Sequence, residues 1–252
     1  MADDGVLYRV YERRLARELS TLPLPQHLGV IVDGNRRWAK ASGASTEEGH
    51  RQGAAKITEF LTWCEELSIP LVTVWMLSHD NLRRPAEELE ALFGIITDTL
   101  GELVDAGYEV RLTGNADVLP EEVREQIRCR QERGRVTREL AVNLAIGYGG
   151  REEIVVAVQE LVRELGAQGL EPDAIAERIT TEAIGEHLYT RGQPDPDLII
   201  RTSGEQRLSG FLMWQSVHSE FWFCETYWPG FRHVDFLRAI RDFCKRERRF
   251  GA

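Results

Sequence analysis

The sequence predicts a single α/β domain whose mostly parallel central sheet is flanked by helices. Short apolar runs alternate along the chain with longer amphipathic stretches, which is the pattern of successive βαβ units. The chain has 252 residues, a length that one hydrophobic core can serve. It contains no internal repeat and no low-complexity linker, so we expect residues 1–252 to form one domain.

Six apolar runs have the length and composition of buried strands. In chain order they are Leu28–Val32, Leu71–Leu77, Tyr108–Leu112, Leu140–Ile146, Leu198–Ile200 and Glu220–Phe223. Branched and aromatic residues dominate them, as expected for strands that are covered by helices on both faces.

The stretches between these strands have helical spacing. Pro85 fits the first turn of a helix, and apolar residues recur after it every three or four positions. The expected helices cover Thr46–Leu67, a segment starting at Pro85, Gly150–Leu165, Pro172–Ile179, Thr181–Leu188 and His233–Arg246.

Residues 1–24 are expected to form an N-terminal helical extension. Within Leu7–Leu19, one face carries Leu7, Val10, Tyr11 and Leu15, and the arginines lie largely elsewhere. Such a helix can pack on the body of the protein or on a partner subunit, which is the favoured interpretation. Contact with an anionic membrane surface is the alternative.

Composition excludes several functional classes. Hydrophobic residues make up 42% and charged residues 29%, as in ordinary globular proteins. The net charge of −10 argues against non-specific nucleic-acid binding. The four cysteines lack metal-ligand spacing, and no secretory signal or 18-residue apolar run is present. We therefore expect free thiols and a cytoplasmic protein, with membrane contact at most peripheral.

Three loops that combine arginines with hydroxyl or amide side chains follow three of the predicted strands. They are Asp33–Trp38, Ser78–Pro85 and Arg201–Ser209. Because ligands of open α/β sheets bind beyond the carboxyl ends of the strands, we expect these loops to converge at one rim. Two arginine clusters and an acidic residue suit two phosphorylated substrates, or one long one.

The first loop has the residues expected of a site for a metal and a phosphate. Gly34 lets the backbone approach a ligand closely, and N–H groups entering a following helix can hold phosphate oxygens. Asp33 is a hard oxygen ligand that suits Mg²⁺. The structural alternative is an Asp-Gly turn that ends the strand and carries surface arginines.

The other two loops also have structural alternatives. In the second, Ser78 and Asn81 can bind a ligand and Arg84 can hold a phosphate, but Asp80 or Asn81 can instead cap the next helix. The third is either a diphosphate clamp or a salt-bridged surface loop. Glu220 is either a second metal ligand or a solvated side chain.

Ordered motifs extend over nearly the whole chain, from about Pro25 to Gly251. They include Asp33-Gly34-Asn35-x-Arg37-Trp38-Ala39, Gly49-His50, Ser78-x-x-Asn81-x-x-Arg84-Pro85, Tyr148-Gly149-Gly150-Arg151 and the run from Asp197 to Glu220. In these motifs the sequence resembles the cis-prenyltransferase family, which includes undecaprenyl diphosphate synthases. Arg36 and the segment Gly204–Gly210 are most similar to actinobacterial short-chain members that make (2Z,6E)-farnesyl diphosphate.

The resemblance implies an Mg²⁺-dependent enzyme with an apolar tunnel beside the sheet. Such an enzyme joins isopentenyl diphosphate to a short allylic diphosphate, and geranyl diphosphate is the primer that the short-chain likeness implies. Family members are homodimers in which an Arg-x-Gly near the C-terminus reaches the neighbouring site. Arg249 and Gly251 match this motif, and a frayed terminus is the alternative.

The resemblance also assigns roles to individual residues. Asp33 would bind Mg²⁺ and help the allylic diphosphate to leave, and Glu220 would support the metal. Asn81 would lie near the proton that is removed, although a neutral amide is better suited to positioning a diphosphate oxygen or a water. The allylic site would contain Gly34, Asn35, Arg36, Arg37, His50 and Arg84, with Trp38 near the prenyl chain. Isopentenyl diphosphate would contact Arg201, Arg207 and Ser209. The substrate-binding set would be completed by Ser78, Asp80, Leu82 and Leu208.

Two departures from long-chain family members bear on substrate and product. Many of these have Gly in place of Arg36 and Arg in place of Thr46, so we hypothesise that Arg36 takes over a phosphate contact. Met76 stands where long-chain relatives often have Ala. A bulky side chain there would fill the tunnel early, because cores are close-packed. The alternative is that Met76 is an ordinary core residue.

Other functions remain open from the sequence alone. A long- or medium-chain polyprenyl diphosphate synthase shares the same motifs, and so does an enzyme that condenses two allylic diphosphates. A non-catalytic partner subunit is the candidate from another class, although Asp33, Asn81 and Glu220 are all retained. An unrelated phosphohydrolase or nucleotide-binding module is a further candidate, but its glycine-rich and nucleophile motifs are missing. The Asp-rich repeats of trans-type synthases are also missing.

Overall fold

The computed structural model describes residues 6–19 and 21–246, and it confirms the predicted α/β class. Within these residues a six-stranded sheet has the order β3-β4-β2-β1-β5-β6, and every pair of neighbouring strands is parallel. The strands are β1 (His27–Ile31), β2 (Leu71–Ser78), β3 (Glu109–Thr113), β4 (Ala141–Tyr148), β5 (Leu198–Arg201) and β6 (Glu220–Phe223).

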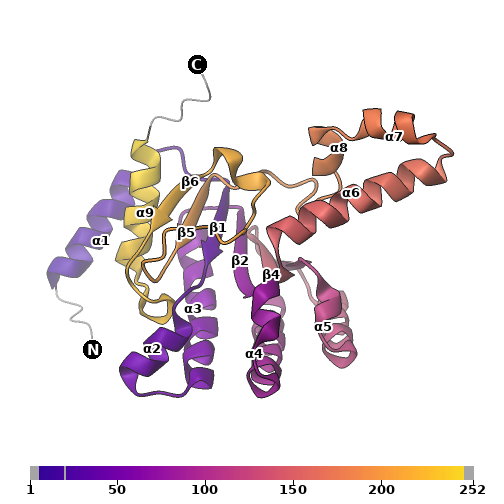
Figure 1. Cartoon of the computed structure of the whole chain (residues 1–252). Helices are drawn as coiled ribbons and strands as arrows, with labels where there is room; N and C mark the ends of the chain where they lie inside the picture. The colour runs from indigo at the N-terminus through magenta and orange to yellow at the C-terminus, as the bar shows by residue number, and fades with distance from the viewer. Residues whose placement is uncertain (1–5, 20, 247–252) are drawn as a thin grey trace.

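Helices cover the sheet and connect its strands (Figure 1). They are α1 (Val6–Leu19), α2 (Asn35–Ser42), α3 (Thr46–Glu66), α4 (Ala86–Asp105), α5 (Glu121–Arg133), α6 (Gly150–Ala167), α7 (Pro172–Arg178), α8 (Thr181–Gly185) and α9 (His233–Lys245). Short 3-10 turns occur at η1 (His79–Arg83), η2 (Ala116–Val118), η3 (Gln215–His218) and η4 (Trp228–Gly230).

Two helices, α2 and α5, were not among the helical ranges predicted from the sequence. Helix α2 has only eight residues and begins within Asp33–Trp38, which was interpreted as a ligand-binding loop. The second is strongly polar, and Ile127 is the residue whose side chain it buries in the main core. Neither stretch has the repeated apolar spacing by which a helix is detected in a sequence.

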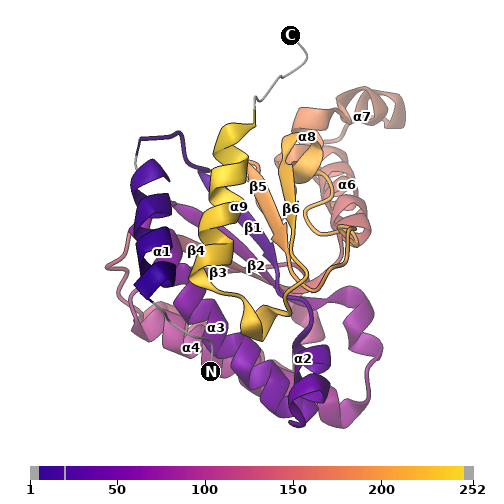
Figure 2. The ribbon, with the colours of Figure 1, turned by 90° about the vertical axis from the view of Figure 1, so that its left-hand side faces the viewer.

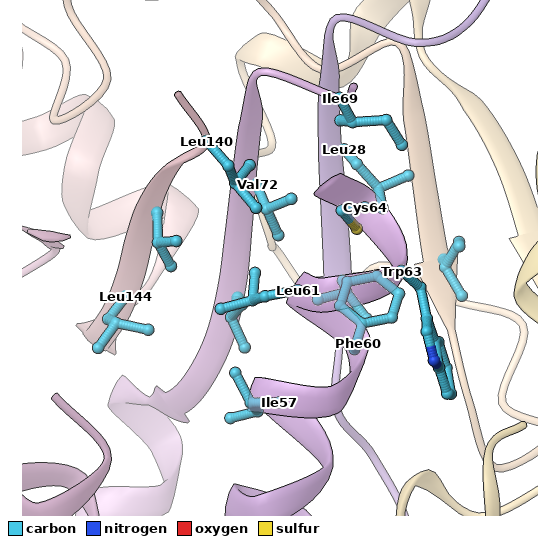
Figure 3. Close-up of a cluster of buried hydrophobic side chains, with 14 of the residues drawn as sticks. Leu28, Ile57, Phe60, Leu61, Trp63, Cys64, Ile69, Val72, Leu140 and Leu144 are labelled. Atoms are coloured by element: carbon cyan, nitrogen blue, oxygen red, sulfur yellow. The ribbon is translucent and has the colours of Figure 1, made fainter. Parts of the chain in front are cut away.

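The main core lies between one face of the sheet and helices α3, α4 and α9. Side chains of α3 such as Phe60 and Leu61 pack on Leu28 and Val72 of the strands (Figure 3). The ring of Phe60 meets Trp228 edge-on, with ring centroids 5.5 Å apart. Truncating such a fully buried aromatic typically costs about 3–5 kcal/mol, so this face supplies much of the stability.

A smaller cluster covers the other face of the sheet. It consists of Ile31, Trp75, Ala145, Tyr148, Ile199, Phe211 and Leu212. The rings of Trp75 and Phe211 are stacked, with centroids 5.1 Å apart and planes 11° from parallel. Through Phe211 and Leu212, this cluster anchors the loop that follows β5.

The N-terminal helix α1 packs beside α9 (Figure 2). Leu15 and Leu19 are buried, and the guanidinium of Arg238 lies 5.3 Å from the centroid of the Tyr11 ring. This is the predicted packing on the body of the protein. Val10 was expected on the same face but is 56% exposed, because the contact face passes through Tyr11, Leu15 and Leu19.

Candidate active site

A cavity of about 770 Å³ opens at the carboxyl edge of the sheet, where the three predicted loops meet. Most of the predicted site residues line it: Asp33, Gly34, Asn35, Arg36, Arg37, His50, Met76, Ser78, Asp80, Asn81, Arg84, Arg201, Arg207 and Ser209. The parallel sheet brings them together, because β1, β2 and β5 end at the same rim.

The backbone at Gly34 turns from β1 directly into α2. Its φ of 104° lies in the left-handed region, and a Cβ built there would lie 2.8 Å from the Tyr227 ring. Only glycine fits this position without rearrangement. The hydroxyl of Thr202 fixes the backbone of Asp33, the residue before Gly34. Its Oγ1 donates to the Asp33 carbonyl at 2.7 Å and accepts from the Asp33 N–H at 3.1 Å.

The carboxylate of Asp33 lies between two arginines. Arg201 donates from Nη2 to Asp33 Oδ2 at 2.9 Å, and Arg37 approaches Oδ1 at 3.4 Å. Burial works to raise the pKa of Asp33, but hydrogen bonds from Arg201 and Ser203 and the charges of both arginines outweigh it. The pKa therefore lies below its usual value, and Asp33 is ionised at neutral pH.

The loop after β5 has an unusual backbone. Ser203, Ser209 and Leu212 have φ values of 80°, 52° and 45°, which are uncommon for residues other than glycine. Each such residue costs on the order of 1–3 kcal/mol and persists only where its surroundings hold it. Phe211 and Leu212, both fully buried, provide that hold and place Ser209 at the pocket.

Arg201 is the centre of this loop. Its side chain is 6% exposed, and its Nη1 donates to Ser209 Oγ at 3.0 Å and to the Arg207 carbonyl. A buried guanidinium with a rigid fork of donors is suited to phosphate. The same guanidinium also reaches Asp33, so it connects the third loop to the first.

Glu205 lines the pocket but was not singled out from the sequence. Its Oε1 lies 3.4 Å from Arg37 Nη1, and its Oε2 forms an ion pair with Arg207. The salt-bridged loop that had been considered as an alternative is therefore present, inside the pocket. Lys40, Trp75, Ile31 and Val32 are further lining residues that sequence analysis missed.

Ser78 caps η1, the 3-10 turn in the second loop, because its Oγ accepts from the Asn81 N–H at 3.2 Å. Asp80 and Asn81 had been considered as caps of the next helix, but Pro85 occupies the N-cap of α4 without a side-chain hydrogen bond, and both side chains line the pocket. Ser78 Oγ is well placed for capping because Ser78 directly precedes η1 in extended backbone.

The close approach of α2 and α3 positions His50. A Cβ built on Gly49 would lie 2.5 Å from the Asn35 carbonyl oxygen, and one built on Gly53 would lie 2.5 Å from Asn35 Oδ1. Two glycines on one face of α3 thus let α2 pack against it. As a result, His50 on α3 lies at the same pocket as Arg36 on α2.

Some predicted substrate-binding residues do not line the cavity. Leu82 packs against the main core and Leu208 against the smaller cluster, and Trp38 is a half-buried residue of α2. Arg249 and Gly251 lie outside the described residues.

Within one subunit, Glu220 and Asp33 lie at opposite edges of the sheet. It pairs in register with Leu198 at the start of β5, whereas Arg201 at the end of β5 is the residue that reaches the pocket. Its carboxylate instead forms an ion pair with Arg246. The role of Glu220 near the metal was implied by the family resemblance, and the order of motifs along a chain does not show which edge of the sheet a residue occupies.

The pocket is a cationic region in an acidic protein. Arg36, Arg37, Lys40, Arg84, Arg201 and Arg207 line it, against the carboxylates of Asp33, Asp80 and Glu205. By their place in the chain the cations form two groups, one at α2 and the end of η1 and the other in the loop after β5. Asp33 contacts Arg37 of the first group and Arg201 of the second. Two anionic groups can therefore bind on either side of one carboxylate.

The residues around Asp33 fit a magnesium ion that is bound mainly by substrate. Mg²⁺ usually takes one or two carboxylates, substrate phosphates and water. Asp33 is ionised and partly exposed to the pocket, so it can be the protein ligand. In the described part of the chain, no three or more His, Cys, Asp and Glu side chains are grouped as a metal site of their own.

Comparisons with known proteins identify the family. The family model described as "Putative undecaprenyl diphosphate synthase" matches residues 31–251. A (2Z,6E)-farnesyl diphosphate synthase of Thermobifida fusca is 56% identical over 249 residues, which cover 97% of each chain. A short-chain Z-isoprenyl diphosphate synthase of Mycobacterium bovis is 50% identical over 250 residues, 97% of this chain and 95% of the relative.

Solved structures agree with the sequence comparison. Lavandulyl diphosphate synthase from Lavandula x intermedia, solved with dimethylallyl diphosphate, superposes with a TM-score of 0.81 at 32% identity. The match covers 93% of this chain and all of the other. The fold is therefore that of prenyltransferases. The chain belongs to the undecaprenyl diphosphate synthase family, which are the cis-prenyltransferases.

Proposed function

We propose that the protein is a magnesium-dependent cis-prenyltransferase that condenses isopentenyl diphosphate with geranyl diphosphate. The product would be a short Z-prenyl diphosphate, (2Z,6E)-farnesyl diphosphate, with release of diphosphate. The arrangement of two groups of cations on either side of Asp33 is the observation that carries this proposal. The names of the relatives in Thermobifida fusca and Mycobacterium bovis support the short-chain product.

The two groups of cations suggest where each substrate binds. Arg36, Arg37, His50 and Arg84, with the N–H groups that begin α2, would hold the allylic diphosphate. Arg201, Arg207 and Ser209 would hold isopentenyl diphosphate. Both diphosphates then lie next to Asp33, and their hydrocarbon chains can extend toward Trp75 and Met76.

The reaction forms one carbon–carbon bond and breaks one carbon–oxygen bond. C4 of isopentenyl diphosphate joins C1 of the allylic substrate, whose diphosphate leaves, and a proton is lost from C2 of the isopentenyl unit. Arginines that already point at the leaving diphosphate stabilise the charge that develops on it. Asn81 lines the pocket and would position the diphosphate oxygen or water that takes the proton.

Magnesium would supply charge neutralisation on the leaving diphosphate when it is bound. Asp33 is the residue that we propose to hold it, because its carboxylate is ionised within the pocket. The position of Glu220 at the other edge of the sheet gives no support for a shared site within one chain.

Met76 is the proposed limit on product length. It lies at a bulge of β2, where the pairing shifts between Trp75 and Leu77, and its side chain packs against the main core. Met76 shares its face of β2 with Val72 and Val74, so it lies on the side of the sheet that packs on the main core. A growing chain that enters an apolar tunnel beside the sheet would meet this side chain first.

A homodimer remains a proposal. Helices α6, α7 and α8 extend away from the sheet as an arm (Figure 1), and Val155 and Val162 of α6 are exposed on it. Exposed apolar side chains of this kind are suited to a subunit contact.

Peripheral membrane contact through exposed Arg13 and Arg14 of α1 is proposed as well. No helix among the described segments has the length and apolar character needed to cross a bilayer.

A product assay tests the proposed function. Purified protein is incubated with Mg²⁺, labelled isopentenyl diphosphate and, separately, dimethylallyl, geranyl and farnesyl diphosphates. Products are dephosphorylated and resolved by chain length and double-bond geometry. A single fifteen-carbon product with a new Z bond from geranyl diphosphate supports the proposal. Long products would indicate a polyprenyl synthase, and no incorporation from any primer would indicate a non-catalytic subunit.

A further inference from the structure

One carboxylate behind the pocket contacts two of its cationic residues. Glu88, in the first turn of α4, has its Oε1 3.0 Å from Arg84 Nη1 and 3.6 Å from His50 Nε2. Arg84 and His50 line the cavity, but Glu88 does not. A single carboxylate oxygen thus lies next to Arg84, which follows η1, and next to His50 of α3.

All three side chains are largely removed from solvent. The exposed fractions are 16% for Arg84, 10% for His50 and 19% for Glu88. The buried Nε2 of His50 has no hydrogen-bond partner among the described residues, and Glu88 Oε1 lies just beyond hydrogen-bond distance. A buried ring nitrogen without a partner is costly to leave unpaired, so its position next to a carboxylate calls for a functional explanation.

We propose that Glu88 is a positioning residue of the allylic site, which holds Arg84 and His50 at the pocket and becomes the counter-ion of a protonated His50 when a diphosphate binds. This inference rests on the proposed binding of an allylic diphosphate. The proton comes from solvent and bonds to the ring nitrogen of His50, and no other bond is made or broken.

The charges around His50 explain why the proton arrives with the substrate. Burial and the charges of Arg84 on η1's end and Arg36 on α2 lower the pKa of His50, while Glu88 on α4 raises it. Without substrate the two arginines therefore favour the neutral ring. A diphosphate next to these arginines offsets their charge, so the pKa of His50 rises and the Glu88–His50 ion pair can form.

The neighbouring Glu87 provides a matched control. It belongs to the same first turn of α4, carries the same charge and is exposed rather than half-buried. A general effect of removing negative charge near the pocket or near the helix N-terminus would appear in Glu87→Gln as well. An effect that depends on contact with Arg84 and His50 would appear only in Glu88 variants.

The first experiment measures KM for geranyl diphosphate and for isopentenyl diphosphate in the wild type and in Glu88→Ala, Glu88→Gln and Glu87→Gln. We expect Glu88→Ala to raise KM for geranyl diphosphate about tenfold, the loss of one charge-assisted hydrogen bond, without changing KM for isopentenyl diphosphate. If Glu88 merely neutralised Arg84, its removal would free a cation and lower that KM, and this outcome would overturn the proposal.

The second experiment measures the proton directly. Geranyl diphosphate is titrated into the protein by calorimetry in buffers of different ionisation enthalpy, which gives the number of protons taken up on binding. The titrations cover roughly pH 6 to 9, from just below the usual pKa of histidine to well above it. The wild type should take up a proton on binding, and Glu88→Gln, which retains an acceptor for Arg84, should take up less and require lower pH. Equal uptake in the two proteins would overturn the proposal.

These outcomes are distinguishable from a failure of the proposed function. A wild type that binds geranyl diphosphate but forms no product would contradict the proposed reaction, and the calorimetry would still test Glu88. A wild type that does not bind geranyl diphosphate would overturn both.

Discussion

The two edges of the central sheet both hold buried polar side chains, but they hold them differently. At the amino edge, His27 contacts the Pro194 carbonyl and Thr73 Oγ1, each at 2.7 Å, and Asn143 contacts Thr73 at 3.0 Å and Gln193 at 2.6 Å. At the carboxyl edge, charged groups such as Asp33 and Arg201 surround an open cavity.

The difference is in charge and in hydrogen-bond satisfaction. Burial lowers the pKa of His27 to about 4, so the amino-edge network is neutral at physiological pH. Seven buried side-chain atoms of the described residues lack a hydrogen-bond partner, and four of them belong to the pocket residues Asn35, His50, Trp75 and Arg201. The amino edge is built for stability, whereas the carboxyl edge keeps groups available for a ligand.

The largest effect is expected at the carboxyl edge, from Asp33→Asn. The amide still accepts a hydrogen bond from Arg201 but has no charge to bind Mg²⁺, so kcat should fall about a hundred- to a thousandfold. Product formation at saturating substrates measures this. Glu205→Gln changes a carboxylate in the same pocket and should have a much smaller effect; equal losses in both variants would contradict a special role for Asp33.

At the amino edge the expected effect is on stability and depends on pH. The folded pKa of His27 is about 4 and its usual value is 6.5, so between these values the unfolded chain binds a proton that the folded chain does not. Stability is therefore lost as pH falls from 6.5 to 4, by on the order of 3 kcal/mol. Urea unfolding of wild type and His27→Gln at both ends of this range measures the contribution.

The partly buried His187, outside the amino-edge network, is a useful control for this prediction. Hydrogen bonds from its ring to the Ala183 carbonyl and to Glu164 raise its pKa. Its contribution therefore has the opposite sign: it is present at low pH and is lost as pH rises through its folded pKa. If His187→Gln removed the acid sensitivity and His27→Gln did not, the assignment to the amino-edge network would be wrong.

A smaller effect on activity is expected from Arg36→Ala. This arginine lines the allylic side of the pocket and its charge lowers the pKa of both His50 and Arg84. Loss of one phosphate contact should raise KM for the allylic substrate about tenfold and leave kcat largely unchanged. Arg83→Ala, an exposed cation on η1 outside the cavity lining, should behave like the wild type.

The smallest energetic change, Met76→Ala, should alter the product rather than the rate. Removing a few methylenes at the inner wall should admit at least one further isoprene unit. Chromatography of dephosphorylated products measures this, and Met213→Ala is a control because Met213 is 38% exposed. A fifteen-carbon product from Met76→Ala would show that this side chain does not set the length.

Much of the architecture could be predicted from the sequence. The six strands begin and end within a few residues of the predicted runs, because branched apolar segments between polar loops have few other stable arrangements in a βαβ chain. The rim of the pocket could be predicted for the same reason, since Asp33, Ser78 and Arg201 each occur at or just after a strand end. The polar helix α5 could not, because little of its surface is apolar.

The sequence by itself therefore determined the fold class, the family and the three loops that meet at one edge. Only the tertiary structure decided which charges meet there. It brought Glu88 and Glu205 into contact with site arginines and placed Glu220 at the other edge. The physical reason is that strand patterns are local, whereas distances between side chains depend on strand order and helix packing.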